Sequence, residues 1–503
     1  MKKPNILLIT SDQQHWDTLG CSNPRIQTPA LDRLAREGTR FDRAYCNNPV
    51  CSPSRSTIIT GLYPSWHHCW TIGVKLPEDV PTVGQLFGAN GYSTTLVGKA
   101  HFQPLASTRE QSSLECQPLF KDLDFWRGFH GPWYGFEKIE IARMHGDEAH
   151  VGQHYAAWME ERGLKNWRQY FQEWPPNSKS KQREFSWDLP QEFHYTTWTA
   201  ERSIANIEQS VKEDKPFFLW SSFHDPHPPY LVPEPWASMY DPNAMNPGTL
   251  DPHEFEYMPP HFAKTQEKNP DFSMYGETGF GNHGFSSHLV DPALLRRQIA
   301  IYYGMISFMD QQIGRILDSL DRLGIAENTL VVFSTDHGHY IGQHGLNAKG
   351  PFHFEDGVRL PFLVRHPHIV PAGRRCSALQ GLIDLSPTFL AAAGMEIPGL
   401  MQGVNQLGVW SGKQDRVREE VLVEHRHQPT KVHLRTYIDP RYKMTLYRDQ
   451  PYGELFDLQE DPGEIRNRWS DPNYERIKSD VLHRFMNAEI KREPTRYARI
   501  AGA

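Results

Sequence analysis

Short runs of consecutive apolar residues recur along the chain and are separated by segments with helical spacing of apolar residues. The run NILLIT at 5–10 has no polar residue between Asn5 and Thr10, which is typical of a strand that is buried on both faces of a parallel sheet. Comparable runs are YSTTLV (92–97), FFLWSSF (217–223), TLVVFST (329–335) and PFLVRH (361–366). These runs predict the strands of one central sheet.

Helix signals lie between the predicted strands. Residues 28–38 place Thr28 at an N-cap, Pro29 at the first helical position and Gly38 at the end. Further helices are predicted over 83–91, 195–212 and 292–323. Strands that alternate with helices predict an α/β fold, with a large mixed, mostly parallel central sheet and helices on both of its faces.

The composition or the hydrophobic pattern of the chain changes in three places. Residues 104–195 are rich in Trp, Phe, His and Gln, and residues 226–290 are rich in Pro, Gly, His and Asp. Both segments are interpreted as insertions whose loops shape a substrate pocket. After about residue 415 the chain has short strand-like segments and a final helical stretch at 474–491. We therefore expect a main domain over 1–415 and a small C-terminal α+β subdomain over 416–503.

Length and charge restrict the classes of partner. The chain has 503 residues and a formal net charge of −7, so a nucleic acid or an anionic membrane surface has no electrostatic support as a partner. No run approaches the roughly 18 apolar residues of a membrane-spanning helix. The N-terminal apolar run ends at Thr10, which is short for a secretory segment. We expect a cytoplasmic protein.

Cysteine is used sparingly, and one cysteine has unusual neighbours. None of the six cysteines forms a C-x-x-C pair, and a disulfide framework is not expected in a cytoplasmic protein of this length. Five are interpreted as small buried hydrophobic residues. The sixth, Cys51, lies in PVCSPSRSTIITG (49–61), next to prolines, serines and Arg55.

Polar and charged residues follow four of the predicted strands. Ligands in α/β sheets bind at the carboxyl ends of the strands, so these residues are expected to meet if the strands are neighbours. They are Asp12 and Gln13, Lys99 and His101, His224, Asp225 and His227, and Asp336 and His337, with Lys349 in a later loop. Each alone has a plainer explanation, such as a turn aspartate or a solvated lysine. Their joint occurrence at four strand ends favours a shared site.

The residue types suit the binding of a cation together with an oxyanion. Asp12, Gln13, Asp336 and His337 offer oxygen ligands and one imidazole nitrogen, a set that suits Ca²⁺, Mg²⁺ or Mn²⁺. Lysines, histidines and Arg55 offer positive charge and proton donors, which would hold a tetrahedral oxyanion and stabilise a leaving oxygen.

At this point the sequence resembles a known family. CSPSR at 51–55 matches the C-x-P-S-R signature of the type I sulfatases, which belong to the alkaline phosphatase superfamily. The resemblance extends over nearly the whole chain and includes PNILLITSDQQ, GYSTTLVGKAHF, PFFLWSSFHDPHPP, TLVVFSTDHGHYIGQHG and GELFDLQEDPGEIRN. It implies an alkaline-phosphatase-like fold, with a catalytic sulfatase domain over 1–415.

The resemblance implies a modified nucleophile at Cys51. In this family the cysteine of the signature is oxidised to Cα-formylglycine by a modifying enzyme that reads the signature, including Pro53 and Arg55. One hydroxyl of the aldehyde hydrate attacks sulfur and the alcohol leaves. The second hydroxyl then loses its proton and sulfate departs.

The resemblance also implies a role for each site residue. Arg55 stabilises the hydrate, Lys99 helps to hold the sulfate, and His101 is the base that triggers release of sulfate. His227 lies near the leaving oxygen, although His224 is an alternative for this role, and Lys349 bridges the sulfate and the leaving group. The metal ligands are Asp12, Gln13, Asp336, His337 and the modified Cys51.

Two metal positions depart from the common pattern of the family. Many sulfatases have Asp-Asp where this chain has Asp12-Gln13, and Asp-Asn where it has Asp336-His337. Ca²⁺ is the first expectation, and the nitrogen ligand moves the preference towards Mn²⁺. A similar pair of departures occurs in phosphonate monoester hydrolases, so hydrolysis of phosphonate monoesters or phosphodiesters is the alternative activity. Lys99 and His101 favour a sulfatase.

The expected substrate is a small-molecule or sugar sulfate ester, and the protein could form a homo-oligomer. A non-catalytic sulfosugar-binding protein on the same scaffold is a third alternative. The argument against this last alternative is the presence of Cys51, Arg55, Lys99, His101, His227 and Lys349.

Overall fold

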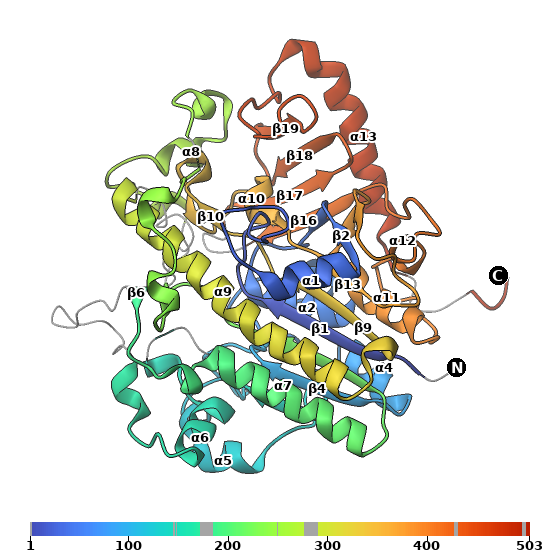
Figure 1. The fold of residues 1–503 in the computed structure, drawn as a ribbon. Coiled ribbons are helices and arrows are strands. Elements are labelled where there is room, and N and C mark those ends of the chain that lie inside the picture. The colour runs from blue at the N-terminus through green and yellow to red at the C-terminus, as the bar shows by residue number, and fades with distance from the viewer. Residues whose placement is uncertain are drawn as a thin grey trace.

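The central sheet of the computed structural model has eight strands in the order β14-β2-β13-β9-β1-β7-β4-β5 (Figure 1). The structure describes residues 3–143, 146, 148–171, 185–248, 250–275, 290–426, 431–494 and 499–502. Among these strands β13 alone runs antiparallel to its neighbours, so the sheet is mixed and mostly parallel, as predicted. The strands are β1 (Asn5–Ser11), β2 (Thr39–Phe41), β4 (Ser93–Gly98), β5 (Lys138–Ile141), β7 (Phe217–Ser222), β9 (Thr329–Thr335), β13 (Leu363–Arg365) and β14 (Arg374–Cys376).

Helices cover both faces of the sheet because the central strands are apolar on both faces. Ile6 and Leu8 of β1 pack into one core cluster, and Leu7 and Ile9 pack into another on the opposite face. The first face carries α2 (Cys51–Thr60), α4 (Val83–Ala89) and α11 (Leu385–Ala392). The second carries α1 (Pro29–Glu37), α7 (Tyr195–Lys212) and α9 (Pro292–Arg322), which cross the front of the sheet in Figure 1.

The segment 104–195 contributes more than loops. It holds the edge strand β5, together with α5 (Leu123–Gly128) and α6 (Gln153–Glu161). The two helices pack against each other, and Tyr155 and Trp167 of the segment form an aromatic core together with Trp198 of α7. Residues 172–184 of this segment lie outside the described residues, as do 249 and 276–289 of the second predicted insertion.

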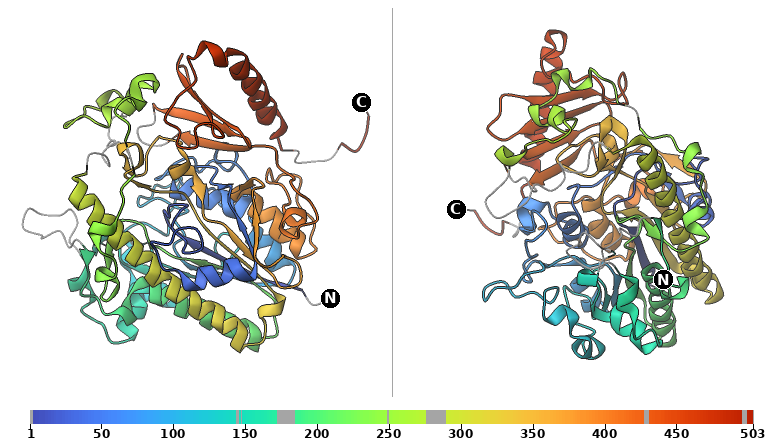
Figure 2. Two further views of the ribbon diagram at one scale, coloured as in Figure 1. Left: turned by 45° about the horizontal axis from the view of Figure 1, so that its top comes forward. Right: turned by 90° about the vertical axis from the view of Figure 1, so that its left-hand side faces the viewer.

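A separate antiparallel sheet forms the C-terminal part of the chain. It consists of β16 (Val421–Arg426), β17 (His433–Ile438), β18 (Tyr442–Tyr447) and β19 (Gly453–Asp457), followed by α13 (Glu475–Lys491). Val421 and Val423 pack into the same core cluster as β1, whereas Leu422 faces α13. Figure 2 shows this sheet, in orange and red, against the main body with α13 on its outer side.

Short elements complete the described structure. They are the small sheets β12-β3-β15 (Arg359–Leu360, Ala44–Tyr45, Gln380–Gly381), β10-β11 (Tyr340–Ile341, Asn347–Ala348) and β6-β8 (Phe185–Ser186, Leu231–Val232), with the helices α3 (Pro64–His67), α8 (Pro260–Lys264), α10 (Glu355–Val358) and α12 (Leu407–Trp410).

The cysteine prediction needs one correction. Cys46, Cys69, Cys116 and Cys376 are buried, as expected, but Cys21 is exposed in the turn that precedes α1, so it is not a core residue. All six cysteines are free thiols. None of the described helices combines the length and the hydrophobicity that crossing a bilayer requires.

Candidate active site

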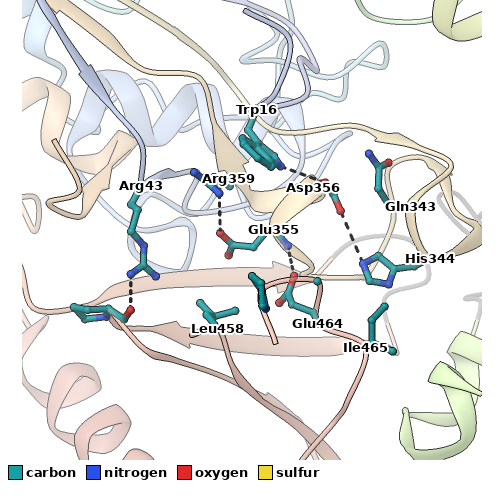
Figure 3. A pocket seen from close by; sticks show the side chains of 13 residues that line it. Trp16, Arg43, Gln343, His344, Glu355, Asp356, Arg359, Leu458, Glu464 and Ile465 are labelled. Carbon is teal, nitrogen blue, oxygen red and sulfur yellow. Dashed lines mark hydrogen bonds and ion pairs between the residues drawn. The ribbon is translucent and has the colours of Figure 1, made fainter. Parts of the chain in front are cut away.

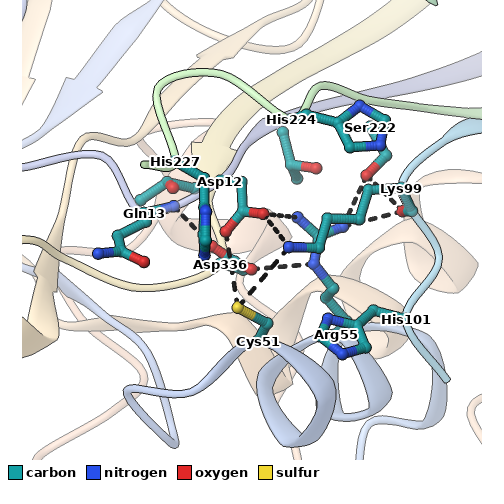
Figure 4. A network of polar contacts seen from close by, with 12 residues as sticks. Asp12, Gln13, Cys51, Arg55, Lys99, His101, Ser222, His224, His227 and Asp336 are labelled. Carbon is teal, nitrogen blue, oxygen red and sulfur yellow. Dashed lines mark hydrogen bonds and ion pairs between the residues drawn. The ribbon is translucent and has the colours of Figure 1, made fainter. Parts of the chain in front are cut away.

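The four strands that precede the predicted site residues are direct neighbours in the sheet, in the order β9-β1-β7-β4. Their carboxyl ends therefore open onto one region, where the loops after them meet the N-terminus of α2. Figure 4 shows the resulting network. It brings together Asp12 and Gln13 after β1, Asp336 after β9, Lys99 and His101 after β4, and His224 and His227 after β7.

Cys51 is the first residue of α2, directly after the N-cap Val50. Pro53 fits the first turn of this helix because the missing backbone N–H has no partner there in any case. All ten residues of α2 are buried, and the helix ends at Gly61 with a left-handed φ of 66°. The partial positive charge of the helix N-terminus thus lies at the Cys51 side chain, where it favours an anion.

A cluster of possible metal ligands surrounds the Cys51 sulfur. One ligand atom from each of Asp12, Cys51, Asp336 and His337 lies within 4.8 Å of the others, and all four residues are buried. Cys51 Sγ is 3.2 Å from His337 Nε2 and 3.7 Å from Asp12 Oδ1. His337 Nδ1 donates to the carbonyl oxygen of Gly338 at 3.0 Å, so Nε2 is the ring nitrogen that faces the cluster.

Gln13 adds an amide to this cluster. Its Oε1 atom is buried and, among the described residues, has no hydrogen-bond partner. A buried acceptor without a donor needs an explanation, and a bound cation provides one. Two carboxylates, an amide oxygen and an imidazole nitrogen fit a divalent cation of the Ca²⁺, Mg²⁺ or Mn²⁺ type.

Three cations also approach Cys51 and the two carboxylates. Lys349 Nζ lies 3.2 Å from Cys51 Sγ, and Lys99 Nζ lies 3.9 Å from it while pairing with Asp12 Oδ2. Arg55 Nε donates to Asp336 Oδ2 at 2.9 Å. Three positive side chains in this arrangement are what a site for an oxyanion requires.

A glycine turn positions Lys99. Gly98 has a φ of 101°, and a Cβ atom there would lie 1.9 Å from the carbonyl oxygen of Ser222 on β7. The chain can therefore approach β7 this closely only without a side chain. The carbonyl oxygen of Lys99 then accepts hydrogen bonds from Arg55 Nη1 and Ser222 Oγ, at 2.9 and 2.7 Å.

The charges of the cluster shift its pKa values in opposite directions. Burial opposes ionisation of Cys51, but Lys349, Lys99 and His337 bring the pKa of the thiol well below its ordinary value. Burial and the nearby Cys51 also oppose charge on Asp12, yet Lys99, His227 and Arg55 hold its pKa below the ordinary value. Burial and repulsion by Asp12 raise the pKa of Asp336, although His337 and Arg55 act in the opposite direction.

The two histidines after β7 differ in position. His224 Nε2 donates to the carbonyl oxygen of Ala142 at 2.8 Å, and burial lowers the pKa of His224 to about 3. His227 is half-buried and interacts with Cys51 through its side chain, and burial lowers its pKa. The geometry therefore favours His227 over His224 for a role beside Cys51.

His101 lies on the other side of Cys51 and hydrogen-bonds with it. Its backbone has a left-handed φ of 62°, which is costly for a residue other than glycine. Glu115 holds this conformation, because its carboxylate accepts from His101 N at 3.3 Å and from Gln103 N at 2.7 Å. Arg143 pairs with Glu115 at 3.6 Å and is itself buried.

Sequence reasoning missed Glu115 and Arg143 because their segment has no clear periodicity. It also missed His339, which contacts Gln13, although DHGHYIG places it two residues after His337. A histidine so close to two expected ligands was the available signal.

One large cavity lies outside the cluster. It has a volume of about 560 Å³ and lies where the C-terminal sheet meets the main body, and Figure 3 shows its lining, which includes Trp16, Arg43, Glu355, Asp356, Arg359 and Glu464. The cavity beside His227, bounded by Trp187, Tyr195 and His224, measures only about 10 Å³. The site is thus identified by its chemistry and not by cavity volume.

Comparisons with known proteins agree with this chemistry. The chain is 28% identical over 500 residues to an arylsulfatase of Clostridium perfringens, covering 97% of this chain and 95% of the relative. It is 26% identical over 484 residues to the sulfatase YidJ of Escherichia coli, covering 96% and 86%. The solved phosphonate monoester hydrolase of Agrobacterium radiobacter has the same fold, with a TM-score of 0.78, 24% identity, and coverage of 98% and 96%.

Family models cover almost all of the chain. The model of N-sulphoglucosamine sulphohydrolase, C-terminal, matches residues 342–491, which include the C-terminal sheet and α13. The Sulfatase model matches residues 4–395, from β1 to just beyond α11, and therefore includes every strand end that contributes to the cluster. The chain belongs to the sulfatase family, on the fold of the alkaline phosphatase superfamily.

Proposed function

We propose that this protein hydrolyses a sulfate monoester to an alcohol and inorganic sulfate, with Cys51 as the precursor of the nucleophile. The observation that carries the proposal is the position of Cys51 at a helix N-terminus, within 4 Å of Asp12, Lys99, His337 and Lys349. A tetrahedral anion placed there would meet positive charge from several directions.

The nucleophile is proposed to be the formylglycine hydrate at position 51. One of its hydroxyls supplies the nucleophile, and loss of the proton from the other releases sulfate. Cys51 is only 1% exposed in the folded chain, so a modifying enzyme could reach its thiol only before folding is complete. Conversion during synthesis is therefore part of the proposal.

The residues around position 51 are assigned roles by their positions. Arg55 is fixed by Asp336 and Ser222 and would hold the hydrate. Lys99 and Lys349 would neutralise the sulfate oxygens. His227 would donate a proton to the leaving oxygen, and His101 would take the proton from the hydrate in the release step.

The proposed metal ligands are Asp12, Gln13, Asp336, His337 and the modified Cys51. A divalent cation bound there would polarise a sulfate oxygen and offset the charge of the two carboxylates. The oxygen ligands make Ca²⁺ the first expectation, and the His337 nitrogen makes Mn²⁺ the alternative.

The proposed function is tested by mass spectrometry of the peptide that contains Cys51, together with turnover of an aryl sulfate. The active preparation should contain formylglycine, and Cys51→Ala should have no turnover. Active enzyme with an unmodified thiol would contradict the mechanism. If Cys51→Ala keeps the biological role of the protein without any turnover, the result would instead favour a non-catalytic sulfosugar-binding protein.

One observation favours a second activity, hydrolysis of phosphonate monoesters or phosphodiesters. The cluster contains Gln13 and His337 where many sulfatases have an aspartate and an asparagine, and the fold is shared with a phosphonate monoester hydrolase. Lys99 and His101 support the sulfatase. A kcat/KM larger for phosphonate esters than for every sulfate ester would reverse the ranking, although a tenfold ratio reflects only about 1.4 kcal/mol.

The alcohol part of the substrate is proposed to be a sugar or a small molecule, in keeping with the N-sulphoglucosamine name of the C-terminal family model. The domain boundary at 415/416, a cytoplasmic location and homo-oligomer formation stay predictions from the sequence.

A further inference from the structure

Gln13 is held in an unfavourable backbone conformation. Its φ is 61°, in the left-handed region that non-glycine residues rarely adopt. Gln13 N donates to Asp336 Oδ1 at 3.0 Å, and the hydroxyl of Tyr302 donates to Gln13 O at 2.9 Å. The same hydroxyl accepts from His15 N at 2.8 Å. Tyr302 belongs to the buried part of α9, so this helix fixes the backbone of Gln13.

A chain of hydrogen bonds also fixes the side-chain amide of Gln13. Gln13 Nε2 donates to His339 Nδ1 at 2.8 Å, so Nδ1 carries no proton. The proton of the neutral ring is then on Nε2, which lies 2.9 Å from the hydroxyl oxygen of Tyr230 and donates to it. The His339 ring stacks on Tyr302, with centroids 4.8 Å apart and an interplanar angle of 19°.

The amide nitrogen of Gln13 is thus hydrogen-bonded to His339, which leaves Oε1 as the atom that can bind the cation. Oε1 is buried and accepts no hydrogen bond from the described residues. A carboxylate in this position would offer two equivalent oxygens in either orientation. An amide offers only one, so its orientation must be set by a neighbour.

We propose that His339, supported by Tyr230, is the positioning residue that directs the Gln13 amide oxygen towards the cation held by Asp12, Asp336 and His337. The inference depends on the metal site of the proposed function. Residues that orient a metal ligand without touching the metal typically change metal affinity by about 10- to 100-fold when they are replaced. The histidine is needed here because this chain has an amide in place of a second carboxylate.

The test is titration of the metal-free protein with Mn²⁺ and with Ca²⁺ by calorimetry, which does not depend on turnover. His339→Leu removes the acceptor, and the dissociation constant should rise by about 10-fold or more. His339→Asn returns an acceptor oxygen near the position of Nδ1 and should recover part of the affinity. Tyr230→Phe should weaken metal binding by less, because it removes only the hydrogen bond from His339 Nε2 that keeps the proton on that nitrogen.

A double variant separates positioning from general damage. If His339 acts through Gln13, then Gln13→Ala combined with His339→Leu should bind the metal no more weakly than Gln13→Ala alone. His353→Leu is the matched control, since His353 is also a buried histidine, bonded to Thr436 at the C-terminal sheet. This control should keep the wild-type affinity.

The outcomes are distinguishable. Wild-type protein that binds neither cation would overturn the proposed metal site and this inference with it. Wild-type binding that His339→Leu leaves unchanged, or additive losses in the double variant, would overturn only the role of His339. If His339→Leu does not fold, Tyr230→Phe and His339→Asn decide, and unchanged affinity in both contradicts the inference.

Discussion

Lys349 Nζ lies 3.2 Å from Cys51 Sγ, although the two residues are 298 positions apart in the chain. Cys51 is the first residue of α2, and Lys349 follows the short strand β11. In the proposed reaction, the Lys349 ammonium group would contact the sulfate and the leaving oxygen together. The separation in sequence means that the whole domain must fold before this contact exists.

Replacement of Lys349 tests its proposed contact with the transition state. Lys349→Ala should lower kcat/KM for an aryl sulfate by about 100- to 1000-fold, the usual cost of removing one donor to a developing oxyanion. Lys413→Ala, at an exposed lysine, is the matched control and should have wild-type kinetics. A loss below threefold for Lys349→Ala would show that the ammonium group does not contact the reacting group.

His101→Ala should slow the release of sulfate more than the transfer of sulfate to the enzyme. The reason is that His101 is assigned to the proton of the second hydroxyl, which matters only after transfer. Rapid-mixing kinetics should then show a burst of alcohol, and the peptide around position 51 should carry a sulfate by mass spectrometry. Equal slowing of both steps, with no trapped sulfate, would remove this assignment.

Glu115→Gln should give a weaker form of the His101→Ala behaviour. The carboxylate of Glu115 accepts from the backbone nitrogens of His101 and Gln103, and the neutral amide would hold the strained φ of His101 less firmly. The burst should persist while the steady-state rate falls. Glu110→Gln, at an exposed glutamate of the same segment, is the control and should change neither rate.

Asp336→Asn should reduce the bound metal. Asp336 lies in the ligand cluster, and the substitution removes the negative charge that holds a cation there. Elemental analysis after dialysis should find less Ca²⁺ or Mn²⁺ per chain than in the wild-type protein. Equal metal content in both proteins would place the cation elsewhere.

The stability of the protein should depend on the ionisation of Asp310, a buried residue of α9. Asp310 accepts from Ala30 N and Leu31 N at the start of α1, and burial raises its pKa to about 7. The folded state therefore binds a proton that the unfolded chain has lost, and stability falls as the pH rises from about 4 to about 7.

Asp310→Asn removes this titration. Urea unfolding of both proteins at pH 5 and pH 8 should show the variant relatively more stable at pH 8, because the wild-type protein loses at most about 1.4 kcal/mol per pH unit from this group. A stability difference that is the same at both pH values would contradict the raised pKa.

The sequence was sufficient to predict the strands that are buried on both faces. β1, β7 and β9 are continuous apolar runs, and parallel strands between two helical layers require such runs. β5 was not predicted, because the alternation of charged and apolar residues in KIEI covers only four positions. Strands of three residues such as β2 and β14 carry too little pattern to be recognised.

The site could be predicted as far as its residues follow strands or belong to the family signature. Asp12 and Asp336 directly follow β1 and β9, and the topology of the sheet then brings them together. The roles of Glu115 and His339 could not be found in this way, because each acts on a neighbour through a hydrogen bond that exists only after tertiary packing. Sequence spacing does not encode such contacts.

The central claim is that the group at position 51 is a formylglycine that forms a sulfated intermediate. It is tested most directly by intact-peptide mass spectrometry of position 51, on preparations that contain different fractions of converted cysteine, alongside active-site titration with an aryl sulfate. The account predicts that the fraction of active sites equals the fraction of formylglycine and that the unconverted thiol contributes no turnover. Activity that is independent of the converted fraction would contradict it.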